Sequence, residues 1–263
     1  MLQRRTAPNG VVFYASPLLD RVGVPHGFST RIGGHSPPPF DSFNLGNPIG
    51  CDIQDDYGRI LGHYPLLQEA TGCPRGEWCR LHQVHGAGVV RVVCGVPFDK
   101  ATQGDAVVSD DPTRAIAVRV ADCTPILTAT DDGKTVAAVH AGWRGVVAGV
   151  LVAALHEMNT RPARVVAAIG PCIGFDAFEV GGEVIDAFTS AFGPEAPVRR
   201  RGDGKGHVDL RECLRQQLLN AGVPAEQIDM TDRCTYRDRA EFYSHRRDNG
   251  VTGRMAAMIA PRA

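Results

Sequence analysis

Five short runs of apolar, mostly β-branched residues follow one another between residues 89 and 140, and they constrain the fold more than any other feature. The runs cover residues 89–93, 106–109, 115–120, 126–130 and 136–140. Runs of this length and composition are typical of strands in a buried sheet. Two later runs, 164–169 and 255–260, predict further strands.

Three segments carry helical patterns between or after these strands. Residues 146–158 are apolar on most faces and follow the 136–140 strand through a glycine turn, which predicts a buried helix. Residues 182–192 and 209–221 are amphipathic, and Gly222 marks the end of the second segment. The Gly- and Pro-rich segment 32–40 predicts a loop. Elements mixed in this way predict a layered α+β fold that forms one domain over residues 1–263, without a simple Rossmann order.

Charge and hydropathy exclude several classes of function. The chain has 28 basic and 29 acidic residues, so it has no broad positive electrostatic field that would attract nucleic acid or an anionic membrane. No apolar run after the basic amino terminus has the form of a secretory signal, and the apolar stretch 146–155 is half of what a bilayer requires. We therefore expect a cytoplasmic protein whose eight scattered cysteines stay reduced.

Two histidines and a cysteine stand where apolar runs give way to polar or glycine-rich sequence. They are His85, Cys123 and His140, which supply the nitrogen and sulfur donors of a catalytic zinc site with one open position. Zinc lowers the pKa of a bound water to about 7. His82 is a rival ligand, because it shares a helical face with His85 if that segment is helical. The competing interpretation is a buried small cysteine and two core histidines with satisfied hydrogen bonds.

Other polar residues are candidates for substrate contacts. Arg144 follows a glycine turn at a helix start, where an anion binds readily, and Arg246 stands beside aromatic residues in a basic segment suited to phosphate or ribose. Arg31 and Asn44 flank the Pro-rich loop and offer guanidinium and amide groups. Asp122 could orient a ligand or transfer a proton. Helix capping, loop capping, turn formation and a solvated basic surface are the alternatives.

Seven motifs together resemble a known family. They are His26–Arg31, Ser42–Gly46, Gln83–Gly86, Ala121–Cys123, Val139–Gly145, Gly170–Gly174 and Ser244–Arg247. In this order they resemble the multicopper polyphenol oxidase or laccase-domain family, also described as purine nucleoside phosphorylases with adenosine deaminase activity or as peptidoglycan editing factors. The resemblance extends from residue 26 to about residue 254.

The resemblance implies that His85, Cys123 and His140 hold the metal and that His82 does not. It implies phosphorolysis of adenosine, inosine and S-methyl-5′-thioadenosine to the free base and a ribose 1-phosphate, with adenosine deamination as a second activity. It also implies a mixed α/β sandwich related to deamidating cysteine hydrolases. The expected partners are a purine nucleoside and phosphate, and the expected cofactor is Zn²⁺, for which Cu²⁺ can substitute.

Chemistry separates the activities attached to this family. A laccase needs a further copper cluster rich in histidine, and a chain with nine histidines and no His-x-His pair argues against copper-dependent polyphenol oxidation. The signatures of cytidine-type deaminases are absent, so the general acid for deamination must lie elsewhere, with Asp122 and Glu179 as candidates. For phosphorolysis, Arg31, Arg144 or Arg246 could position phosphate.

Two further hypotheses remain open from the sequence. A metal-free hydrolase or amidase with Cys123 as nucleophile and His140 as base could edit peptidoglycan precursors. A binding module that senses a purine without turnover is the other.

Overall fold

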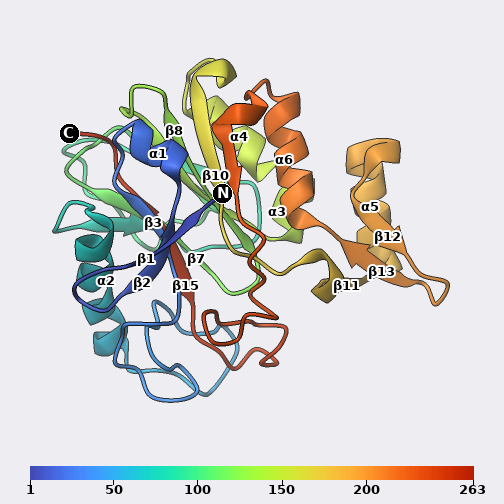
Figure 1. The fold of residues 1–263 in the computed structure, drawn as a ribbon, viewed down its shortest axis with the longest axis horizontal. Helices are drawn as coiled ribbons and strands as arrows, with labels where there is room; N and C mark the ends of the chain where they lie inside the picture. The colour runs from blue at the N-terminus through green and yellow to red at the C-terminus, as the bar shows by residue number, and fades with distance from the viewer.

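The computed structural model describes all residues 1–263, and two six-stranded mixed sheets form its body (Figure 1). The first sheet has the order β1-β2-β3-β15-β7-β4. Its strands are β1 (Gln3–Thr6), β2 (Val12–Ala15), β3 (His26–Ser29), β15 (Met255–Ile259), β7 (Ala115–Val120) and β4 (Trp78–Arg80). All neighbours are antiparallel except β4 and β7.

The second sheet has the order β14-β10-β8-β9-β6-β5. Its strands are β14 (Ile228–Met230), β10 (Val165–Ile169), β8 (Thr124–Thr130), β9 (Val136–Ala141), β6 (Ala106–Ser109) and β5 (Val89–Val92). The central pair β8 and β9 is antiparallel, with Thr124 opposite Ala141. The start of β8 and the end of β9 therefore lie side by side at one end of the second sheet.

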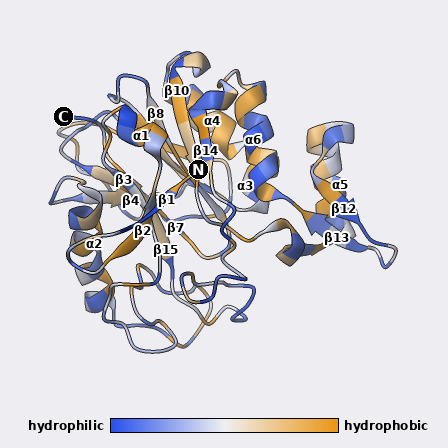
Figure 2. Ribbon diagram, viewed as in Figure 1, coloured by the Kyte–Doolittle hydropathy of each residue, from blue (hydrophilic) through white to orange (hydrophobic).

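The two sheets pack against each other because inner strands such as β10 and β15 are apolar and buried on both faces. Alternate residues such as Ile116 and Val118 of β7 meet Leu127 and Ala138 of the second sheet in one buried core. In Figure 2 the inner strand β10 is largely hydrophobic, whereas β1 is hydrophilic. The opposite face of β7 carries Ala117, which belongs to a separate core.

Helices cover both outer faces, which gives four layers. Helix α2 (Tyr57–Thr71) places Tyr64 and Leu67 in the core on the first sheet. Helices α3 (Trp143–Val147), α4 (Val150–Glu157) and α6 (Leu210–Asn220) pack on the second sheet, on the other side of the body (Figure 1). The short helix α1 (Pro17–Arg21) follows β2.

A small third sheet projects from the side of the body together with one helix, at the right of Figure 1. Its order is β11-β13-β12, formed by β11 (Glu179–Gly181), β13 (Lys205–Val208) and β12 (Val198–Arg200). Helix α5 (Gly182–Phe192) packs on it.

The α+β fold with mixed sheets is confirmed, as are all seven predicted strands, the helices at 182–192 and 209–221 within a residue, and the loop at 32–40. The single helix predicted over residues 146–158 is wrong. The segment forms α3 and α4, separated at Gly149, whose φ of 77° no continuous right-handed helix contains. None of the helices combines the length and the apolar character needed to cross a membrane.

Candidate metal and catalytic site

The second sheet brings three predicted ligands together at the end where β8 begins and β9 ends: His85, Cys123 and His140. Their donor atoms all lie within 4.8 Å of one another. His140 is the penultimate residue of β9, Cys123 immediately precedes β8, and His85 lies in the loop between β4 and β5. The two imidazole rings are 4.9 Å apart, at 78° to each other. His140 is buried, with 3% exposure, whereas His85 is exposed.

Asp105, just before β6, orients both histidines. Its Oδ1 lies 2.8 Å from His140 Nδ1, which leaves Nε2 of the same ring for the cluster. The carboxylate also accepts hydrogen bonds from the backbone N–H groups of His85 at 2.9 Å and Gly86 at 2.7 Å. Asp105 is completely buried. Sequence reasoning missed this residue, although a carboxylate directly before a buried apolar run is a usable signal.

Two residues at the cluster have backbone dihedral angles in the left-handed region, with positive φ. His85 has φ of 60° and Asp122 has φ of 84°, and neither is a glycine. Such residues cost of order 1 kcal/mol each and are frequent at functional sites. Gly142 allows close approach, because a Cβ there would lie 2.9 Å from Cδ2 of His85 and 3.1 Å from Sγ of Cys123.

The cluster favours a thiolate. Burial alone would raise the pKa of Cys123, but the positive charge and hydrogen bond of His140 and the hydrogen bond of His85 lower it to about 6. Burial would lower the pKa of His140, but the Cys123 thiolate and Asp105 raise it to about 9. Thiolate is the form of cysteine that binds metal and attacks electrophiles.

The donor set fits a zinc ion. In a tetrahedral site with bond lengths of about 2.0 Å to nitrogen and 2.3 Å to sulfur, neighbouring donors are about 3.5 Å apart. The observed cluster is compact enough to reach that geometry by small side-chain rotations. Three protein donors leave a fourth position open, as in catalytic zinc sites.

The two predicted candidates for a general acid are engaged elsewhere. The Asp122 carboxylate accepts hydrogen bonds from Thr235 Oγ1 at 2.6 Å and from the Arg246 backbone N–H at 2.7 Å, so it anchors the segments beside the cluster. The carboxylate of Glu179 forms ion pairs with Arg201 and Lys205 on the small sheet. Neither carboxylate joins the cluster.

The four predicted substrate residues have different surroundings. Arg31 forms an ion pair with Asp41 and lies over the Tyr243 ring at 4.6 Å. Arg144 is exposed and stacks on Trp143, with 4.3 Å from its guanidinium carbon to the ring.

Arg246 and Asn44 complete the predicted set. Arg246 is exposed and donates through Nη1 to the Glu179 carbonyl at 2.7 Å. Asn44 is completely buried; its Nδ2 donates to Asp55, and its Oδ1 accepts from the backbone N–H groups of Gly46 and Arg254. These contacts fix the backbone of Gly46 and Arg254.

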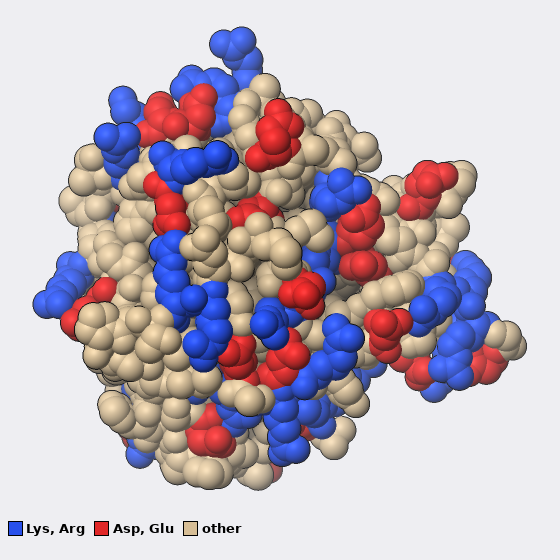
Figure 3. All heavy atoms as spheres, viewed as in Figure 1, with Lys and Arg blue, Asp and Glu red and all other residues tan.

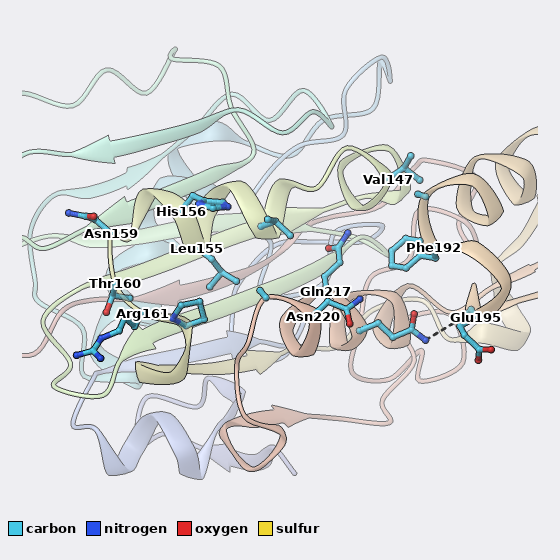
Figure 4. A pocket seen from close by; sticks show the side chains of 15 residues that line it. Val147, Leu155, His156, Asn159, Thr160, Arg161, Phe192, Glu195, Gln217 and Asn220 are labelled. Atoms are coloured by element: carbon cyan, nitrogen blue, oxygen red, sulfur yellow. Dashed lines mark hydrogen bonds between the residues drawn. The ribbon is translucent and has the colours of Figure 1, made fainter.

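Two other features lie apart from the cluster. His82, the rival ligand, is exposed and outside it. A cavity of about 1100 Å³ lies between α4, α6 and the end of α5 (Figure 4). It is lined by residues such as Leu155, Phe192 and Gln217 and includes none of the three donors. Figure 3 shows acidic and basic side chains interspersed over the viewed face, which agrees with the net charge of -1.

The chain is similar to several known proteins over nearly its whole length. A family model described as multi-copper polyphenol oxidoreductase laccase matches residues 25–262. The chain is 41% identical over 238 residues to the purine nucleoside phosphorylase YfiH of Escherichia coli, covering 90% of this chain and 93% of that protein. It is similar in structure to YlmD of Geobacillus stearothermophilus, with a TM-score of 0.87, 34% identity and 99% of each chain covered.

Proposed function

Because this chain belongs to the multi-copper polyphenol oxidoreductase laccase family, whose relatives include proteins named purine nucleoside phosphorylase, we propose that it is a zinc-dependent purine nucleoside phosphorylase. The observation that carries the proposal is the convergence of His85, Cys123 and His140 from three separate segments. The substrates proposed are adenosine, inosine and S-methyl-5′-thioadenosine, each with phosphate. Adenosine deamination is the proposed second activity.

Each residue of the site has a defined task in this proposal. His85, Cys123 and His140 hold the ion, and Asp105 fixes the ring of His140 and the loop of His85. A bound zinc ion supplies Lewis acidity at the open position, and Cu²⁺ can replace it because copper binds such ligands tightly. Asp122 holds the backbone of Arg246 at the rim.

Product analysis tests the proposal. Zinc-loaded protein is incubated with inosine in the presence or absence of phosphate, and hypoxanthine and ribose 1-phosphate are quantified by chromatography. We expect both products in equal amounts and only with phosphate. Adenosine without phosphate should yield inosine and ammonia. Absence of hypoxanthine at high enzyme concentration would contradict phosphorolysis.

The neighbouring histidines provide a matched pair of variants. His85→Ala removes a donor, and we expect it to lower turnover by about 100-fold or more. His82→Ala changes an exposed ring three residues away and should leave turnover within about twofold. Equal losses in both variants would show that the cluster is not the active site.

A second candidate function follows from the same geometry. Cys123, His140 and Asp105 have the order of nucleophile, base and orienting carboxylate found in cysteine hydrolases, and the 2.8 Å contact between His140 and Asp105 favours it. Such an enzyme would cleave an amide, as in editing of peptidoglycan precursors. Chelation separates the two candidates, because a thiolate–imidazole pair retains activity without metal and a zinc site does not.

A further inference from the structure

Two arginine side chains are packed together without a carboxylate partner. Arg119 belongs to β7, and Arg254 immediately precedes β15. Both lie against the buried Gly46: a Cβ there would be 3.0 Å from Cδ and Nη1 of Arg119 and 3.4 Å from Cγ of Arg254. Neither arginine takes part in an ion pair, and both side chains are at least partly withdrawn from solvent. Two like charges placed together out of water are costly unless an anion compensates them.

The sheet directs the two arginine side chains to the same face. In the pairing of β7 with β15, Ala256 lies opposite Arg119, and Arg254 is two residues before Ala256. Directly opposite residues share a face, and so do residues two apart, which makes Arg119 and Arg254 diagonal neighbours. The arrangement is therefore imposed by strand register and not by flexible side chains alone.

Both backbones are fixed by amide side chains from the motifs found in the sequence. The Gln83 amide donates to the Arg119 carbonyl at 2.8 Å and accepts from its N–H at 2.9 Å. Asn44 Oδ1 accepts from the backbone N–H groups of Arg254 and Gly46, at 2.9 and 3.1 Å. Neither amide binds the guanidinium groups themselves, so these contacts position the arginines and leave their donors free.

The donors of the pair are not used up by the protein. Arg254 donates through Nη1 to the carbonyls of Thr252 and Gly253, and its Nε and Nη2 have no protein acceptor. The side chain of Arg119 makes no hydrogen bond, and its Nε is buried without a partner. A buried, unpaired donor in a charged group requires an acceptor, and guanidinium groups bind oxyanions with several oxygens especially well.

Short chain segments and backbone hydrogen bonds connect the pair to the reactive cluster. Cys123 is four residues beyond Arg119 on the same chain segment, and Gln83, which clamps Arg119, is two residues before His85. Burial and Arg119 lower the pKa of Arg254, whereas the negative charges of Cys123 and Asp122 raise it, so Arg254 lies within electrostatic range of both groups.

We propose that Arg119 and Arg254 form the subsite that binds inorganic phosphate next to the His85–Cys123–His140 cluster. The assignment rests on the proposed phosphorolysis for its role, and it replaces Arg31, Arg144 and Arg246, which bind other protein groups or stack on an aromatic ring. A phosphate oxygen attacks C1′ of the nucleoside, and the C1′–N9 bond breaks. Its electron pair leaves with the purine, and the proton of HPO₄²⁻ ends on the base.

Direct phosphate binding tests the assignment independently of turnover. Inorganic phosphate is titrated into the zinc-loaded protein and followed by calorimetry and ³¹P line width. We expect Arg119→Gln and Arg254→Gln each to raise the phosphate Kd by about tenfold or more. Arg119→Lys and Arg254→Lys should restore part of the affinity. Arg21→Gln, which removes an exposed arginine without a side-chain hydrogen bond, should change nothing.

Kinetics and a nucleotide complete the test. Where turnover is present, the variants should raise KM for phosphate and leave KM for inosine within about twofold, which a merely structural role would not do. Phosphate binding that depends on the pair in a protein without phosphorolysis would support the subsite and refute the proposed function. An unchanged phosphate Kd in folded Arg119→Gln would overturn the subsite. Binding of adenosine 5′-phosphate but not inorganic phosphate through the pair would also overturn it.

Discussion

Gly142→Ala is the sharpest test of the metal centre, because it adds one methyl group between two ligands and changes nothing else. Gly142 has φ of -72° and ψ of 167°, which alanine adopts without strain. The added Cβ would lie 2.9 Å from Cδ2 of His85 and 3.1 Å from Sγ of Cys123. Only these two side chains oppose the substitution.

The distances determine the size of the effect. Non-bonded carbon atoms settle at about 3.5 Å or more, so His85 must move by about 0.5 Å, whereas metal–ligand distances tolerate about 0.2 Å. Overpacking of this kind costs about 1–3 kcal/mol. In the metal-free protein the exposed His85 ring turns away at little cost. We therefore expect Gly142→Ala to weaken zinc binding by roughly 10- to 100-fold. The free energy of unfolding of the apo protein should stay within about 1 kcal/mol of wild type.

Competition with a chromophoric chelator measures the zinc Kd, and denaturant unfolding of the apo protein measures its stability. Gly62→Ala is the control, since a Cβ there has no neighbour within 4 Å in the interior of α2. It should leave zinc affinity unchanged and stabilise the fold by up to about 1 kcal/mol. A wild-type zinc Kd in Gly142→Ala would refute the assignment of His85 and Cys123 as ligands of one ion.

Three further predictions follow from other contacts. Asp105→Asn should weaken zinc binding by about 10- to 100-fold in the same chelator assay, because His140 loses its orienting carboxylate. Burial would raise the pKa of Asp55, but hydrogen bonds from Ser36, Asn44, Asp56 and Arg59 lower it. The stabilisation by the Asp55 carboxylate should thus be present above pH about 4 and disappear as the pH falls through the lowered pKa. In Asp55→Asn the free energy of unfolding, measured by denaturant at a series of pH values, should change less over this pH range. Gly149→Ala should destabilise the protein by about 1 kcal/mol in denaturant unfolding, despite the helix propensity of alanine, because φ is 77°.

The strands that hold the cluster could be predicted because their sequence pattern is strong. The runs forming β6 to β10 are short, rich in β-branched residues and alanine, and almost entirely buried, so local composition and tertiary structure agree. The first 80 residues lack this agreement. Helix α2 contains Pro65 and two glycines, and burial of Ile60, Tyr64 and Leu67 maintains it against its own propensity.

The site was predictable in part for a related reason. Sequence motifs identify residues of metal-ligating types, such as His85, Cys123 and His140. They do not identify the carboxylate that orients these residues. Asp105 is 20 residues from His85 and 35 from His140, and its role exists only once β6 lies beside β9. Arg119 and Arg254 are likewise neighbours only through strand register.

Asp105 also couples the two histidine ligands, which has a consequence for their energetics. The same carboxylate binds the ring of His140 and the backbone of the His85 loop, so its loss displaces both donors together. In His85→Ala one of these donors is already gone, and Asp105→Asn can then affect only His140. The losses in zinc affinity from the two substitutions should therefore not add, and the double variant should lose less than their sum. Independent ligands would give additive losses, which would show that Asp105 serves one histidine only.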